Sequence, residues 1–231
     1  MQIFERLINV FAPHSCISCG FEGSLVCEGC QNDMFMATPS ACITCSLPTL
    51  PNTYLCAACS SKSDLHHIWA IGPYAGHLER LIHLLKFERT QEAAKQLATG
   101  INYTLPYLPP ATVIMPIPSA NSRIRQRGYD QTVLIAKKIA QLRNLEFAEG
   151  LERTHNLRQV GADRATRFKQ AQGAYTPLLL NFDPTRPVVL VDDVMTTGAT
   201  AMAAAACLAK QGVRNVSLAA GAIQLLSPSK L

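Results

Sequence analysis

Two adjacent acids, Asp192 and Asp193, follow the apolar run VVLV in the segment VVLVDDVMTTGAT (residues 188–200). Carboxylates at the carboxyl end of a buried strand can accept hydrogen bonds from two vicinal hydroxyls and lie near a divalent cation. The next residues combine hydroxyls, a glycine and the first N–H groups of an expected helix, and such a loop binds phosphate. The residues of this loop are Thr196, Thr197, Gly198, Ala199 and Thr200. A diol-binding pair directly before a phosphate loop suits a ribose 5-phosphate.

Three other interpretations of the acid pair are weaker. A strand that ends in two acids also occurs in Walker B segments, but the chain contains no G-x-x-x-x-G-K-[ST] sequence. The acid pair of a response regulator opens its domain, whereas this pair falls near the end of the chain. Two adjacent acids are common by chance, but the whole apolar run followed by DDVMTTGAT is not.

Eight of the nine cysteines fall in the first 59 residues as four C-x-x-C pairs. Two such turns together can surround one Zn²⁺ tetrahedrally, with Zn–S distances of about 2.3 Å. The simplest partition takes the pairs in chain order, and an interleaved partition stays open. The eight predicted ligands are Cys16, Cys19, Cys27, Cys30, Cys42, Cys45, Cys56 and Cys59. Closed sites of this kind are structural, and metal binding would fold a segment too small for a core of its own.

A disulfide framework and an iron–sulfur cluster are the competing interpretations of the cysteines. Disulfides need an oxidising compartment, and the N-terminal sequence lacks the basic segment and cleavage site of a secretory signal. Regular paired turns favour zinc ribbons over an iron–sulfur cluster. His14, His66 and His67 are expected not to be ligands, because eight thiolates fill two sites. Cys207 lies in an alanine-rich stretch and is expected to be buried in a helix.

The elements that would position these residues alternate between apolar strands and helices, which predicts an α/β fold with a parallel sheet. Asp130 is expected to cap the helix that follows it, and Gly212 to end a later helix. Expected strands cover residues 67–74, 112–118, 188–193 and 213–223. Expected helices cover 76–101 (as one or two helices), 131–144 and 198–211, and a short amphipathic helix is expected near the N-terminus.

Composition and charge narrow the class of protein. Hydrophobic residues make up 48% of 231 residues, which is enough for a buried core, and no apolar run is long enough to span a bilayer. The net charge is +5. Residues 123–169 alone hold eleven basic and five acidic side chains, a net +6. A basic surface attracts phosphates, whether on a small ligand or on a polynucleotide.

The segment at residues 188–200 resembles the signature of type I phosphoribosyltransferases. The resemblance implies a fold of that type, with Asp192 and Asp193 on the ribose hydroxyls of phosphoribosyl diphosphate (PRPP) and residues 196–200 around its 5′-phosphate. It also implies a pyrophosphate loop at residues 115–123, with Pro118 and Ser119 nearest the ligand. Mg²⁺ would accompany PRPP and help to stabilise the departing diphosphate.

A mobile basic loop over the active site is also usual in that family, and residues 157–169 resemble it. In an active enzyme, Arg164 and Arg167 of this segment would close over the diphosphate and exclude water. Arg127 is a further candidate ligand-binding residue, although a turn before a helix explains the Arg127–Gly128 pair equally well.

The order of motifs along nearly the whole chain resembles the ComF-type competence proteins. The family usually has RGFNQ where this chain has RGYDQ, so any side-chain contact at Asp130 is in doubt. Two domains are expected: a double zinc ribbon over residues 1–62 and a phosphoribosyltransferase-like domain over residues 63–231. The resemblance implies a cytoplasmic protein that handles or imports single-stranded DNA during natural transformation, with attachment at the inner membrane left open.

Two classes of function therefore compete. In one, the ribbons and the basic segment contact single-stranded DNA or dock onto a helicase or an inner-membrane uptake channel, and PRPP is a ligand. In the other, the chain is an active phosphoribosyltransferase with an unknown acceptor and has no part in DNA uptake.

Overall fold

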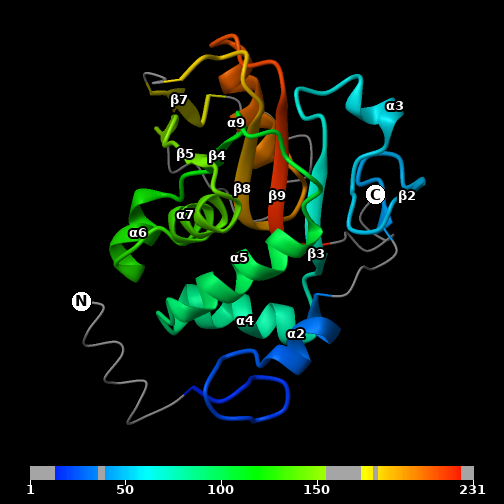
Figure 1. Cartoon of the computed structure of the whole chain (residues 1–231). Coiled ribbons are helices and arrows are strands. Elements are labelled where there is room, and N and C mark those ends of the chain that lie inside the picture. The colour runs from blue at the N-terminus through cyan, green and yellow to red at the C-terminus, as the bar shows by residue number, and fades with distance from the viewer. Residues whose placement is uncertain (1–13, 36–39, 155–172, 179–181, 225–231) are drawn as a thin grey trace.

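The core of the molecule is a five-stranded parallel sheet (Figure 1). The computed structural model describes residues 14–35, 40–154, 173–178 and 182–224. In order across the sheet, the strands are β3 (Ile68–Pro73), β9 (Val216–Ile223), β8 (Val188–Met195), β4 (Val113–Pro116) and β5 (Glu146–Phe147). All eight residues of β9 and the first four of β8 are buried, because helices cover both faces of a parallel sheet.

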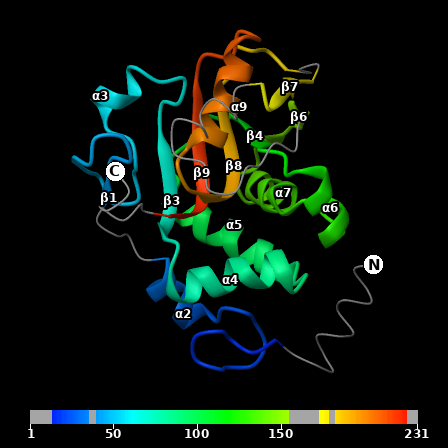
Figure 2. The same ribbon diagram turned by 180° about the vertical axis from the view of Figure 1, so that it is seen from behind.

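Helices form a layer on each face of the sheet (Figures 1 and 2). One face packs against α4 (Gly76–Phe87), α5 (Glu92–Thr104) and α7 (Gln131–Arg143), and their side chains share a hydrophobic cluster with Val189 and Val191. The other face packs against α9 (Ala199–Ala209), in a second cluster with Val188 and Leu190. The predicted α/β class, with helices on both faces of a parallel sheet, is confirmed.

Short elements connect these layers. Helix α6 (Asn121–Arg127) joins β4 to α7. Helices α2 (Glu28–Met34) and α3 (Ala57–Ser60) each begin directly after the first cysteine of the second pair of a group and contain the second cysteine of that pair. Two small antiparallel sheets pair β1 (Ser40–Ala41) with β2 (Pro48–Thr49) and β6 (Leu151–Arg153) with β7 (Tyr175–Pro177). Among the described residues, no helix is long and apolar enough to cross a membrane.

The cysteine-rich segment packs on two separate parts of the sheet domain (Figure 1). Leu25 and Val26, between the first two cysteine pairs, and Phe35, after them, belong to the cluster under α4 and α5. Cys42 and Tyr54, from the second group, belong to the cluster on the α9 face. The boundary near residue 62 stays a prediction, and each cysteine group shares its buried apolar surface with the sheet.

Most predicted elements appear with shifted ends. The helical stretch at 76–101 is two helices, because Arg89 adopts a left-handed conformation with φ 55° and turns the chain between α4 and α5. Asp130 caps α7 as expected, accepting a hydrogen bond from the N–H of Thr132. The strand expected at 188–193 continues to Met195, because its pairing with β9 extends that far. The predicted N-terminal helix and the basic loop at 157–169 lie outside the described residues.

Candidate functional site

The acid pair lies at the carboxyl edge of the sheet. Strand β4 ends at Pro116, which pairs with Val191, so Asp192 and Asp193 extend beyond the last rung that joins β8 to β4. Successive side chains of a strand point to opposite faces, and the two carboxylates therefore meet different surroundings. Gly221 of β9 accommodates the backbone here, because a Cβ at this position would lie 2.6 Å from the carbonyl oxygen of Asp193.

Asp193 is buried and bonded within the protein. Its Oδ1 lies 2.8 Å from Nζ of Lys86, at the end of α4, and its Oδ2 accepts a hydrogen bond of 2.8 Å from Nε2 of Gln131, at the start of α7. A buried charge is stable only when it is paired and hydrogen-bonded, and both conditions hold here. Sequence reasoning missed Lys86 and Gln131. The available signal was a lysine near the end of an amphipathic helix.

Asp192 has a half-buried carboxylate with acceptor capacity to spare. Within the described part of the chain, it accepts one hydrogen bond, 2.8 Å long, from the N–H of Asp193. Burial, and next the neighbouring charge of Asp193, raise the pKa of Asp192 to about 7. Of the two acids, Asp192 is thus the one whose carboxylate has capacity for the hydroxyls of a ligand.

The expected phosphate loop turns directly from β8 into α9. Gly198 adopts φ 77°, in the left-handed region that favours glycine, and stands at the N-cap of α9. The N–H of Ala199 donates to Oγ1 of Thr197 at 3.4 Å, and the N–H of Met202 donates to the carbonyl of Gly198 at 2.9 Å. Thr196 is exposed and Thr197 is buried. The exposed hydroxyl and the amino end of an eleven-residue helix can together receive an anion.

The expected pyrophosphate loop is tied to Asp130. The N–H and the hydroxyl of Ser119 both donate to the Asp130 carboxylate, at 2.9 and 3.0 Å, and the preceding Pro118 is half-buried. Asp130 also accepts from the N–H and hydroxyl of Thr132, so one side chain caps α7 and shapes the loop after β4. The donors of Ser119 are therefore engaged within the protein.

Arg127 lies close to Phe87, the neighbour of Lys86, and within reach of the charge of Asp193. Its side chain is 8% exposed and its guanidinium lies 5.8 Å from the ring centre of Phe87. Burial lowers the pKa of Arg127, and the charge of Asp193 opposes that shift. The predicted site residues Arg164 and Arg167 lie outside the described residues.

The cysteines form two groups of four in chain order, the simpler of the two partitions that the sequence left open. Within each group the sulfur atoms all lie within 4.8 Å of one another, and Sγ atoms of Cys19 and Cys27 and of Cys45 and Cys56 are 3.6 Å apart. A tetrahedral Zn²⁺ with four thiolates sets its sulfurs about 3.8 Å apart, so both groups fit the ion. All nine cysteines are free, and neither group includes His14, His66 or His67.

One buried cysteine in each group is prepared for metal binding. Although burial opposes ionisation, backbone N–H groups directed at the sulfur lower the pKa of Cys16 to about 6. The same arrangement, with N–H groups of Thr44, Cys45 and Cys56, lowers the pKa of Cys42 to about 6. In the same two groups, hydrogen bonds with neighbouring thiols raise the pKa of Cys30 and of Cys59 to about 12. Because metals bind thiolates, all four sulfurs of a group would release their protons together only when a cation binds.

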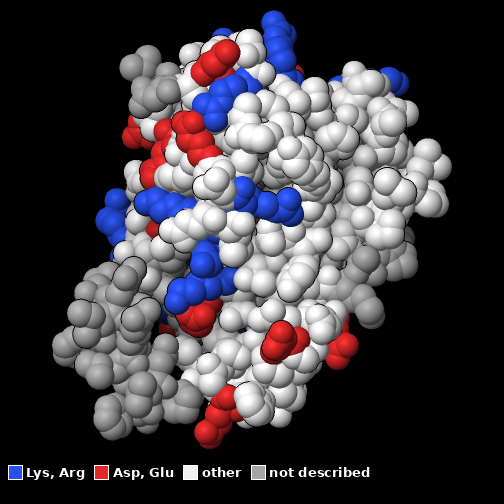
Figure 3. Space-filling view, viewed as in Figure 1, with Lys and Arg blue, Asp and Glu red and all other residues white. Residues whose placement is uncertain are grey.

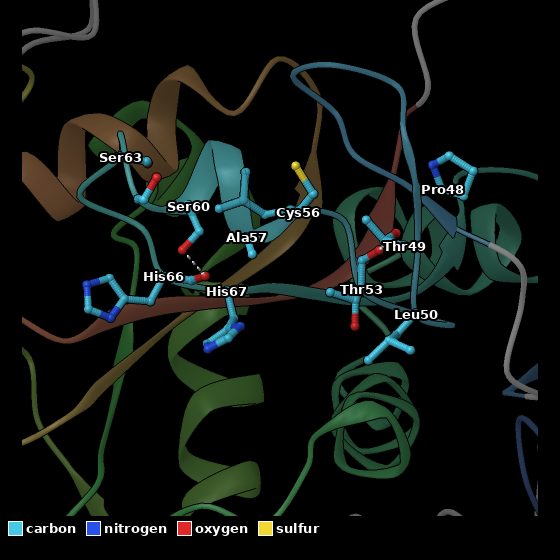
Figure 4. A pocket seen from close by; sticks show the side chains of 12 residues that line it. Pro48, Thr49, Leu50, Thr53, Cys56, Ala57, Ser60, Ser63, His66 and His67 are labelled. Atoms are coloured by element: carbon cyan, nitrogen blue, oxygen red, sulfur yellow. Dashed lines mark hydrogen bonds between the residues drawn. The ribbon is translucent and has the colours of Figure 1, made fainter.

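A cavity of 780 Å³ lies between the second cysteine group and the start of β3 (Figure 4). Its wall includes hydroxyl and imidazole side chains from the 48–67 segment, and Ser60 donates to the carbonyl of His66 at 2.7 Å. His67 stacks on Trp69, with ring centres 5.2 Å apart, and burial lowers its pKa. Of the predicted site residues that the structure describes, the cysteine ligand Cys56 lines this cavity, and none of the residues predicted to bind PRPP does. The sequence carried no signal for the cavity.

Basic side chains gather on one face of the molecule. Lys and Arg form a band over α7 and the adjoining part of α5, whereas acidic side chains on this face are more scattered (Figure 3). Arg125 and Lys137, from the basic segment, are exposed. The described part of the segment therefore has the charge expected of a surface that attracts phosphates.

The amino-acid sequence is similar to those of a competence protein and of DNA utilization proteins. It is 26% identical to competence protein F of Haemophilus influenzae over 224 residues, covering 90% of this chain and 96% of that protein. It is 27% identical to the DNA utilization protein YhgH of Escherichia coli K12 over 190 residues, covering 77% of this chain and 81% of that protein. No family model matches the chain.

Among solved structures, a hypoxanthine phosphoribosyltransferase from Staphylococcus aureus is similar at 12% identity and a TM-score of 0.33, covering 62% of this chain and 66% of the other, just under two thirds. The sequence similarity extends over most of the chain, and the cysteine groups and the parallel sheet are present as the motifs predicted. The chain is therefore a relative of competence protein F and the YhgH proteins, which confirms its resemblance to the ComF type.

Proposed function

We propose that this ComF-like protein binds PRPP at the carboxyl edge of β8 and handles single-stranded DNA during uptake. The ligand proposal rests on one observation. Asp192, whose carboxylate can accept further hydrogen bonds, lies only a few residues before the amino end of α9. Asp192 would hold the ribose hydroxyls, and residues 196–200 the 5′-phosphate. When bound, Mg²⁺ would neutralise charge on the diphosphate.

The two acids take different parts in this proposal. Asp193 is held by Lys86 and Gln131, so its charge supports the site from within the core. Asp192 is the carboxylate that would contact the sugar directly. Ser119 would help through the shape of its loop, since Asp130 engages its N–H and hydroxyl.

Calorimetry with Mg²⁺ and PRPP tests the ligand proposal. Because a hydrogen bond to a charged group contributes about 1.5–3 kcal/mol, Asp192→Asn should weaken binding about tenfold or more. Asp33→Asn makes the same chemical change at an exposed position of α2 and should bind as the wild type does. Equal affinities in all three proteins would refute the assignment of Asp192.

The DNA proposal is supported by the relatives, by the basic band and by the charge of residues 123–169. Binding of an oligo-dT strand should weaken steeply with salt, with a slope of about −0.7 per neutralised phosphate. The double variant Arg125→Gln/Lys137→Gln should reduce that slope, while Lys210→Gln, at the exposed carboxyl end of α9, should not. PRPP binding and ribosyl transfer without any DNA binding would favour the alternative, a phosphoribosyltransferase with an unknown acceptor.

A further inference from the structure

The two cysteine groups contain nearly identical knuckles that pack on different surfaces. The first reads Cys-Ile-Ser-Cys at residues 16–19 and the second Cys-Ile-Thr-Cys at residues 42–45. The N–H of Ile17 donates to Leu25 at 3.0 Å, and that of Ile43 donates to Tyr54 at 3.1 Å, so the local backbone is similar too. Ile17 packs against the cluster under α4 and α5, whereas Ile43 packs against the cluster on the α9 face.

Ile43 lies beside the loop that leads into α9. A methyl group built on Gly198 would lie 3.4 Å from Cδ1 of Ile43 and 3.5 Å from Cε of Met195. These two side chains therefore back the turn at which β8 passes into α9. The conformation at Gly198 directs the first N–H groups of α9, so the position of Ile43 bears on the donors that would meet a phosphate.

The second knuckle is itself anchored to the sheet. Tyr54, whose carbonyl accepts from Ile43, donates its N–H to Ile68 of the edge strand β3 at 2.8 Å. Thr53 forms an antiparallel bridge with Trp69 in the same strand. One side of the knuckle is thus held by β3 and the other by the four sulfur atoms of its group, which fit a metal ion.

We propose that Ile43 is a positioning residue for the phosphate loop, through which the metal-bound second cysteine group supports the conformation of Gly198 and residues 199–201. The first cysteine group has no such role, because Ile17 packs on the opposite layer. This inference rests on the proposed PRPP site for its effect on binding, but the support of the loop is a property of the free protein as well.

Hydrogen–deuterium exchange of the unliganded protein tests the support directly. Ile43→Ala should speed amide exchange in residues 197–202, because the cavity it leaves loosens the turn, while Ile17→Ala should leave exchange there unchanged. Ile43→Leu, which keeps a δ carbon and the volume of the side chain, should restore slow exchange. Zinc content, measured on each variant, should stay at the wild-type value. Equal exchange in the Ile43→Ala and Ile17→Ala proteins would overturn the proposal.

PRPP titration supplies the second readout. Coupling free energies between connected sites correspond to about fivefold or more in affinity, and Ile43→Ala should weaken Mg²⁺-PRPP binding by at least that factor relative to Ile17→Ala. If the wild type fails to bind PRPP, the proposed function fails and exchange alone decides this inference. If the wild type binds and both alanine variants bind equally well, the inference fails and the proposed function stands.

Discussion

At the scale of single residues, the two adjacent aspartates at the carboxyl end of β8 have different hydrogen-bonding partners. Asp193 forms an ion pair with Lys86 and accepts a hydrogen bond from Gln131, so its charge is compensated inside the protein. Asp192 is half-buried beside a like charge, which raises its pKa to about 7. Adjacent positions in a strand face opposite layers of the fold, and this geometry alone produces the difference.

The raised pKa of Asp192 predicts a pH dependence with a definite sign. The unfolded chain ionises this group near 3.8 and the folded chain near 7, so ionisation opposes folding and stability from this group falls as pH rises between those values. Binding of ribose hydroxyls and a cation needs the charged form. PRPP affinity should therefore rise through neutral pH, by up to about tenfold per unit below the pKa.

Calorimetry from pH 6 to pH 8 measures this effect. Asp192→Asn is the control, because the phosphates of PRPP titrate equally in both proteins and only the contribution of the carboxylate is lost. A profile for the wild type no steeper than that of the variant would contradict the prediction.

Replacing only one partner of the Lys86–Asp193 ion pair should strongly lower the stability of the fold. Lys86→Met leaves a buried carboxylate without its cation and should lower the free energy of unfolding by about 3–5 kcal/mol. Lys95→Met breaks an exposed pair with Glu92 and should cost about 0–1 kcal/mol. Urea denaturation of both variants decides this, and equal losses would show that Asp193 is solvated.

At the scale of elements, β8 and β9 must approach closely beside the acid pair. The contact of Gly221 with the carbonyl oxygen of Asp193 leaves no room for a side chain. Gly221→Ala should therefore destabilise the protein by about 1–3 kcal/mol through backbone displacement. Gly29→Ala, in open space on α2, should be neutral or slightly stabilising. Thermal unfolding of the two variants is the measurement, and an unchanged midpoint for Gly221→Ala would contradict the packing described.

At the scale of the whole molecule, the two cysteine groups attach to opposite layers of one sheet. Each shares a hydrophobic cluster with that layer, so metal binding should stabilise the entire chain. Elemental analysis should find about two zinc ions per chain. Removal of zinc with a chelator should lower the thermal midpoint, and readdition should restore it. One ion or none per chain would contradict the two-site assignment.

The sequence by itself determined much of this protein. Spacing of the cysteines predicted two metal-binding groups, although the structure decided between a chain-order and an interleaved partition. Apolar runs that alternate with helical periodicity predicted the parallel sheet. Asp130 was recognisable as a helix cap, because capping depends on residues next to each other in the chain. Cysteine spacing, hydrophobic periodicity and helix capping each depend on residues that are close in sequence, so short sequence patterns are enough to predict them.

Only the tertiary structure decided which side chains meet across the chain. Lys86 and Asp193 are far apart in sequence, and their pairing depends on how α4 packs on the sheet. The position of Ile43 beside Gly198 likewise depends on where the second cysteine group packs on the sheet. The two knuckles have almost the same sequence, so nothing local distinguishes Ile43 from Ile17. The physical reason is that long-range contacts are set by the shapes of packed surfaces, which no short motif encodes.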